Sequence, residues 1–345
     1  MPFKIMGKTP FGAHLEAIKN SPYYKKNGFE NLSVTPTMAE DASFFKIFFG
    51  FFNKPKNVEP PAELPHIKTD LKNITSDKPT IVWFGHSSYF IHIDGKNILV
   101  DPVFSGNASP ISSMVKAFLG ANTYQPEDFP VIDHLILTHD HYDHLDYKTI
   151  VQLKPKIKQV VCPLGVSSHL VYWGYDKNII TELDWWQTAE LDHTATITAA
   201  PARHFSGRGL TRGKTLWTSY IFKIGKYNFY LGGDSGYDTH FNKIGDRFGP
   251  FDIAILECGQ YNVAWPYIHM MPEQVVQAAI DLQAKVLMPV HWGKFTLASH
   301  PWDEPIKRVT KQAELSGMKI TTPMIGEPVI LDTNYPDNKW WESVH

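Results

Sequence analysis

Residues 139–144 read His139-Asp140-His141-Tyr142-Asp143-His144. This run follows an apolar stretch, Val131 to Leu137, that predicts a short strand. A loop that begins at a strand end has a rigid support and stays accessible. Imidazole nitrogens and carboxylates suit zinc, and so many ionisable groups in one short run would repel each other without a cation. The run therefore predicts a metal site.

Three further candidate ligands follow predicted strands. His204 comes after Thr194 to Ala199, Asp234 after the strand ending at Leu231, and His291 after Lys285 to Val290. Each alone would more often be a cap or a turn residue. Together with the run they can hold two ions, with Asp234 bridging. The predicted metal ligands are His139, His141, Asp143, His144, His204, Asp234 and His291.

The composition is that of a globular protein. The 345 residues are 43% hydrophobic and 20% charged, and the formal net charge of -2 argues against a nucleic-acid partner. The two cysteines, Cys162 and Cys258, form no CxxC pair, and they suit a reducing compartment. We find no signal-peptide pattern and no apolar run of about 18 residues, so we expect a cytoplasmic protein.

The chain changes character near residue 75. Residues 1–75 hold polar stretches and a proline-rich linker, and we predict that they form an N-terminal extension packed on one globular domain, 76–345. Within that domain the strands come in two batches with helices between them, which favours two packed sheets with helices outside. The clearest predicted helix is Pro272 to Gln283. The clearest hairpin turn is Asp94-Gly95, between Ser88 to Ile93 and Asn97 to Val100.

The chain resembles the metallo-β-lactamase superfamily, which pairs a His-x-His-x-Asp-His run with a distant His, Asp and His. Within it, the chain is similar to the N-acylphosphatidylethanolamine phospholipase D group. The residues that carry this narrower resemblance are Trp83 to Ser88, Leu99 to Phe104, Glu182 to Trp186, Pro201 to Ser206, Gly233 to Tyr237, His269 to Glu273 and His291 to Phe295. Three places depart from the group's pattern: Phe205, Ser235 and the pair Met270-Met271.

The resemblance implies an α/β fold, a four-layer αββα sandwich of two mixed sheets with outer helices. It also implies a binuclear site with two Zn²⁺, or Mn²⁺ or Fe²⁺ in their place, where a bound water reaches a pKa of about 7. The expected reaction is phosphodiester hydrolysis of N-acyl phosphatidylethanolamine-type phospholipids. Asp143 would orient the nucleophile. His269 would assist the leaving group or bind the phosphate, unless it is a surface histidine beside a helix.

Other residues near the predicted site have two interpretations each. Asp101 is either a hydrogen-bond acceptor for a ligand imidazole or a turn residue before proline. His86 either borders the pocket or lies in a turn. Arg203 and Arg208 either contact a phosphate or form surface ion pairs.

The segment Phe44 to Phe52 is apolar on nearly every face if it is helical, apart from Lys46. Core packing is the commoner fate of such a helix. Docking into a membrane interface is the alternative, and it would place the protein peripherally at the inner face of the membrane.

Other functions remain open on the sequence alone. A lactonase acting on a phosphorylated sugar acid, or a hydrolase of another small substrate, is the main alternative. A nuclease would need basic surface, a di-iron redox protein of this fold would carry Glu at His141, and a degenerate binding module would not keep all seven ligands. The oligomeric state is open, with a homodimer among the options.

Overall fold

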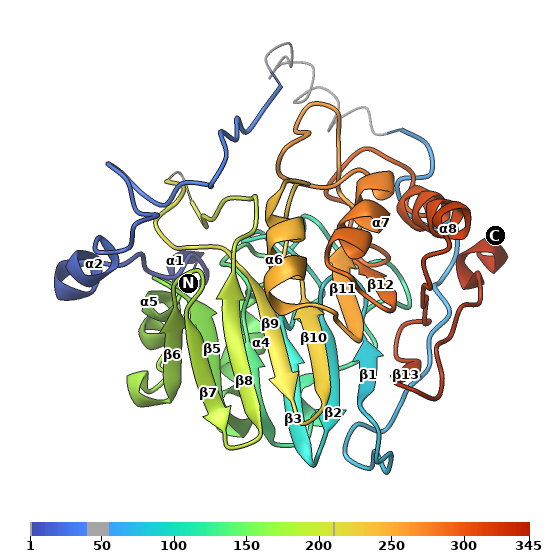
Figure 1. The fold of residues 1–345 in the computed structure, drawn as a ribbon, viewed down its shortest axis with the longest axis horizontal. Coiled ribbons are helices and arrows are strands. Elements are labelled where there is room, and N and C mark those ends of the chain that lie inside the picture. The colour runs from blue at the N-terminus through green and yellow to red at the C-terminus, as the bar shows by residue number, and fades with distance from the viewer. Residues whose placement is uncertain (1, 40–54, 210) are drawn as a thin grey trace.

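The computed structural model describes residues 2–39, 55–209 and 211–345 (Figure 1). The phenylalanine-rich segment Phe44 to Phe52 lies outside these residues, so both interpretations of it stay predictions.

Within the described residues, seven strands form the first sheet in the order β13-β1-β2-β3-β4-β5-β6. The pairs from β13 to β3 are antiparallel and those from β3 to β6 are parallel, so the sheet is mixed. Its strands are β1 (Thr80–Trp83), β2 (Tyr89–Ile93), β3 (Lys96–Val100), β4 (Ile132–Ile136), β5 (Ile157–Pro163), β6 (Ile180–Leu183) and β13 (Pro328–Ile330).

The second sheet, again counted over the described part of the chain, has six strands in the order β12-β11-β10-β9-β8-β7. Antiparallel pairs run from β7 to β10 and parallel pairs from β10 to β12. Its strands are β7 (Thr188–Asp192), β8 (Ala195–Ala200), β9 (Ser219–Ile224), β10 (Tyr227–Leu231), β11 (Ile253–Glu257) and β12 (Leu287–Val290).

Helices cover the outer faces of the two sheets, as Figure 1 shows for α6 and α7 in front of the second sheet. The α-helices within the described residues are α1 (Pro2–Ile5), α2 (Gly12–Ile18), α4 (Tyr147–Leu153), α5 (Ser167–Tyr172), α6 (His240–Phe248), α7 (Pro272–Asp281) and α8 (Glu304–Ser316). Short 3-10 helices are η1 (Pro126–Asp128), η2 (Lys154–Lys156), η3 (Lys177–Ile179) and η4 (Trp340–Ser343). The predicted αββα sandwich of two mixed sheets is confirmed.

Alternation along the strands builds two cores. In β3, Ile98 and Val100 belong to the core between the sheets, where Phe222 of β9 also lies. Leu99 points to the opposite face and packs in the cluster that includes Leu153 of α4. Because neighbouring residues of a strand face opposite sides, a strand that is apolar throughout must be covered on both faces.

The Asp94-Gly95 turn joins β2 to β3 as predicted. Both residues have positive φ, 49° and 69°, the backbone of a tight hairpin turn that matches strand twist. None of the helices in the described ranges has the length and apolar character needed to cross a bilayer.

Candidate metal centre

Four strand ends meet at one edge of the sandwich. The run 139–144 follows β4, His204 follows β8, Asp234 follows β10 and His291 follows β12. In the second sheet, β8, β10 and β12 run in the same direction, so their carboxyl ends lie on the same side. The structure thus brings all seven predicted ligands together from segments distant in sequence.

One group of donor atoms consists of His139 Nε2, His141 Nδ1, His204 Nε2 and Asp234 Oδ2. His141 Nδ1 lies 3.0 Å from His139 Nε2 and 3.2 Å from His204 Nε2. Asp234 Oδ2 lies 3.9 Å from His139 Nε2 and 3.7 Å from His204 Nε2. Ligand atoms at about 2.0–2.1 Å from a tetrahedral zinc stand about 3.3 Å apart, so these spacings fit such an ion.

A second group consists of Asp143, His144, His291 and His86, a residue outside the predicted ligand set. Asp143 Oδ2 lies 2.9 Å from His86 Nε2, 3.6 Å from His144 Nε2 and 4.0 Å from His291 Nε2. The side chain of His86 is fully buried, and its backbone φ is +53°. His86 is therefore part of the cluster and not simply a turn residue.

Asp234, a member of the first group, also lies beside the second, because its two carboxylate oxygens face different neighbours. Oδ2 faces His139 and His204, whereas Oδ1 lies 3.1 Å from His144 Nε2 and 2.9 Å from His291 Nδ1. This is the arrangement that a carboxylate shared by two cations requires.

The surrounding residues fix the orientation of the imidazoles. His144 Nδ1 lies 2.7 Å from Asp101 Oδ2, so the predicted contact of Asp101 with an imidazole is confirmed. Thr138 donates its backbone N–H to the other Asp101 oxygen at 2.9 Å. His204 Nδ1 lies 2.8 Å from the carbonyl of Ile268. A partner at the remote ring nitrogen selects the tautomer and leaves the other nitrogen free to bind a metal.

The protonation states of the cluster suit a cation. Burial lowers the pKa of His139 and of His204 well below the usual value, which leaves neutral imidazoles. Although burial raises the pKa of Asp143 and of Asp234, the neighbouring His144 holds both well below the usual range. His144 is the exception: burial lowers its pKa, but Asp234 and Asp143 outweigh this and raise it well above the usual value. A metal ion would have to displace that proton, because neutral imidazoles and carboxylates are the forms that bind metals.

Four buried atoms of the cluster make no well-aligned hydrogen bond among the described residues: His86 Nδ1, His144 Nε2, Asp234 Oδ1 and His291 Nε2. Asp234 Oδ1 is near two imidazole nitrogens, but the geometry is not that of a hydrogen bond. Buried polar atoms are normally paired, because an unpaired one costs about 1–3 kcal/mol. Orphaned nitrogen and oxygen atoms that converge on one space fit a metal ion.

His269 lies at the mouth of the cluster and not on a free surface. Its Nδ1 lies 2.7 Å from Glu257 Oε2, and its ring centroid lies 5.0 Å from that of His204. Burial lowers the pKa of His269, but the Glu257 carboxylate outweighs this and raises it to about 9. Glu257, which ends β11, is absent from the predicted set although it obeys the same strand-end rule as the ligands.

The other members of the neighbourhood have structural roles. Arg208 is buried and donates to the carbonyls of Asp140 and Leu145, so neither of its predicted roles holds. Arg203 donates to the carbonyl of Val34 and lies 3.6 Å from Asp238. Since both guanidiniums are engaged by the protein, neither is placed to receive a phosphate.

Asp140, within the run itself, turns away from the cluster. It accepts from the backbone N–H of Gly207 at 2.7 Å and from the hydroxyl of Thr215 at 2.9 Å. It thereby ties the run to the loop that follows His204.

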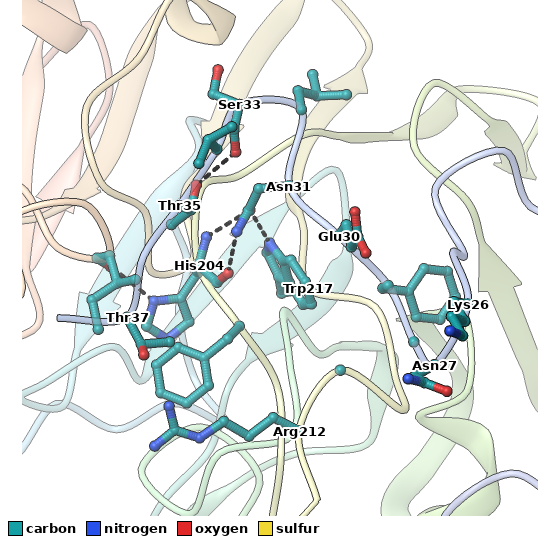
Figure 2. Close-up of a pocket in the computed structure, with 17 residues that line it drawn as sticks. Lys26, Asn27, Glu30, Asn31, Ser33, Thr35, Thr37, His204, Arg212 and Trp217 are labelled. Atoms are coloured by element: carbon teal, nitrogen blue, oxygen red, sulfur yellow. Dashed lines mark hydrogen bonds between the residues drawn. The ribbon is translucent and has the colours of Figure 1, made fainter.

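Two adjacent cavities give access to the cluster. One of about 180 Å³ is lined by five residues of the cluster, together with Gln260, Trp265, His269 and Leu297; the five are His141, Asp143, His204, Asp234 and His291. A larger one of about 800 Å³ lies between residues 26–37 and the segment after β8 (Figure 2). His204, Phe205 and Ile268 line both cavities, so a molecule in the larger cavity would lie beside the cluster.

The fold and this cluster define a metal-dependent hydrolase with the metallo-β-lactamase architecture. The family model for the beta-lactamase superfamily domain matches residues 96–292, and the chain belongs to this superfamily.

Curated relatives agree with this assignment. An uncharacterized Mycobacterium tuberculosis protein is 38% identical over 328 residues, which cover 94% of this chain and 88% of that protein. The N-acyl-phosphatidylethanolamine-hydrolyzing phospholipase D 1 of Caenorhabditis elegans is 32% identical over 268 residues, covering 71% of this chain and 74% of the relative. Among solved structures, Igni18, a metallo hydrolase from Ignicoccus hospitalis, superposes with a TM-score of 0.56 at 21% identity, over 74% of this chain and all of that chain. At that identity the structural match supports the fold alone.

Proposed function

We propose that the seven predicted residues hold two divalent ions, with zinc as the metal. The ligands would be His139, His141, Asp143, His144, His204, Asp234 and His291. The proposal rests mainly on Asp234, because its two carboxylate oxygens face two separate groups of donor atoms. Two ions held there would supply Lewis-acid polarisation of the substrate and an activated water.

We propose phosphodiester hydrolysis of N-acyl phosphatidylethanolamine-type phospholipids as the reaction. The similarity to the Caenorhabditis elegans enzyme over 71% of this chain supports that substrate class. The larger cavity supports it as well, because it offers room for the substituents of a diester beside the cluster.

Two residues of the chain would assist the reaction directly, Asp143 and His269. Asp143, held by His86 at 2.9 Å, would orient the nucleophile. His269, held by Glu257, faces the small cavity and would donate a proton to the departing alkoxide or bind the phosphate. Asp143 is buried, His269 is half-buried, and each is held by a hydrogen-bonding partner.

Arg212 would attract the anionic substrate. Its guanidinium carbon lies 4.5 Å from the ring centroid of Phe205, and that ring in turn lies 4.6 Å from the ring of His141. Arg212 is exposed in the larger cavity and forms no ion pair within the described part of the chain. Its charge is therefore free for a ligand.

The test is a substrate panel on the zinc-loaded protein, with product analysis. The panel contains an N-acyl phosphatidylethanolamine, a generic aryl phosphodiester and a sugar-acid lactone. The proposal expects phosphatidic acid and an N-acyl ethanolamine from the lipid. Turnover of the lactone without any diester cleavage would favour the lactonase instead and contradict the proposal.

A further inference from the structure

In the described part of the N-terminal segment, the side chain of Asn31 binds a residue of the candidate metal centre. The amide of Asn31 pairs with both backbone polar groups of His204 (Figure 2). Asn31 Nδ2 donates to the His204 carbonyl at 2.8 Å, and Asn31 Oδ1 accepts from the His204 N–H at 3.1 Å. The indole N–H of Trp217 donates to the same Oδ1 at 3.0 Å.

These bonds matter because His204 is buried in a loop beyond the end of β8. In a strand, the backbone N–H and C=O would pair with a neighbouring strand, but here a side chain from residue 31 takes that place. The His204 ring is fixed separately, by the contact of Nδ1 with the Ile268 carbonyl. Backbone and ring together aim Nε2 at the cluster.

Asn31 is itself held on both sides. Before it, the backbone N–H of Phe29 donates to the Gly213 carbonyl at 2.8 Å, and the Phe29 ring packs in a core with Trp217. After it, Arg203 donates to the Val34 carbonyl at 2.8 Å. Because Asn31 is held on both sides, its amide can fix the position of the His204 backbone.

We propose that Asn31 is a positioning residue for the metal centre, which sets the His204 backbone so that Nε2 can complete one of the two ion sites. The inference rests on the proposed function of the cluster. It also gives the N-terminal extension a part in the active site, and so makes its packing on the domain 76–345, which we propose as well, a functional requirement.

The test measures zinc binding, not only turnover. Metal-free full-length protein is titrated with zinc in competition with a chromophoric chelator, which yields two dissociation constants. Wild type is compared with Asn31→Leu, Asn31→Asp and the matched control Asn20→Leu, which alters an exposed asparagine of the same extension. The thermal midpoint of each metal-free variant is recorded alongside.

We expect Asn31→Leu to raise one dissociation constant by about 10- to 100-fold and to leave the other unchanged, since residues that orient a ligand commonly have effects of this size. Asn31→Asp is isosteric and keeps both accepted bonds, but it sets a carboxylate oxygen against the His204 carbonyl in place of the donor. It should also raise the same constant and leave the other unchanged, and it provides the test if the leucine variant does not fold. Asn20→Leu should match wild type.

Two results would overturn the positioning role. One is a pair of unchanged constants in both Asn31 variants. The other is an equal weakening of both constants together with a lower thermal midpoint, which a general loosening would produce. A wild-type protein that binds no zinc would instead contradict the proposed function itself.

Discussion

The buried carboxylate of Glu257 holds the half-buried His269 and also binds two backbone N–H groups. Its Oε2 lies 2.7 Å from His269 Nδ1. Its Oε1 accepts from the backbone N–H groups of Ser235 and Met270, at 2.9 Å and 3.3 Å. Glu257 therefore ties the loop that carries His269 to the loop that carries Asp234.

Replacing this carboxylate tests the role of His269. Glu257→Gln keeps an oxygen for the backbone contacts but puts an amide against the imidazole. We expect kcat on the hydrolysed diester to fall by about 10²-fold, the lower range for positioned acid–base groups, with KM and zinc content nearly unchanged. His269→Gln should lower kcat similarly, and the double variant little further. A kcat equal to that of wild type in both single variants would remove His269 from the mechanism.

Asp101, which follows β3 of the first sheet, can be used to test whether the orientation of the His144 imidazole matters for metal binding. It lies 2.7 Å from His144 Nδ1 and is almost fully buried. Asp101→Asn should weaken zinc binding by about 10- to 100-fold, because the amide orients the imidazole poorly. The exposed Asp337 provides the control, Asp337→Asn. Equal zinc affinity in the two variants would show that the contact does not orient His144.

Substitution of Arg212 tests whether the substrate is anionic and whether it binds in the larger cavity. Arg212→Ala should raise KM for an anionic diester several-fold and affect kcat less, because the lost interaction is made away from the reacting bond. Arg247→Ala is a matched control, since Arg247 also stacks on aromatic rings, those of Trp186 and Phe248, but does not line the cavity. The same KM in both variants would exclude Arg212 from substrate binding.

The burial of Lys294 predicts that the free energy of unfolding depends on pH, independently of the metal ligands. Burial lowers its pKa from 10.5 to about 7, and its ammonium contacts the carbonyls of Phe84 and Val103. Below pH 7 the folded chain bears the full cost of a buried charge. Between about pH 7 and 10.5 the unfolded chain binds the extra proton, so stability rises with pH by up to about 1.4 kcal/mol per unit.

Lys294→Met removes this titration. The thermal midpoint of wild type should therefore rise relative to that of Lys294→Met between pH 7 and 9. The exposed Lys223 gives the control, because Lys223→Met should follow wild type. A constant difference between wild type and Lys294→Met across this range would show that Lys294 does not titrate there.

The centre of the fold was predictable from the sequence because its signals are local. β12, for example, is buried along its whole length and is an apolar run, and it lies within the stretch Lys285 to Val290 that was predicted to form a strand. The strands β6, β7 and β13, each at the edge of a sheet, are harder to predict. They are half-exposed, unlike β12, which also lies at an edge but is buried throughout, and the residues of β6 and β7 do not form an apolar run.

The predicted ligands share one visible feature, a place just after a strand, and this is why they could be named in advance. Glu257 shares that feature but has no motif around it to separate it from a cap. Asn31 gives no local signal at all, because its partner His204 lies 173 residues away. Arg208 is the opposite case, a residue whose sequence position suggests a function that it does not have. Its charge near the motif suggests phosphate binding, but in the fold it donates to the carbonyls of Asp140 and Leu145.

The most direct test of the binuclear centre is an anomalous diffraction map at the zinc edge, from crystals of the full chain grown with zinc. The account predicts two peaks that share Asp234, one beside Oδ2 with His139 and His204, the other beside Oδ1 with His144 and His291. A single peak, or zinc bound away from Asp234, would contradict it.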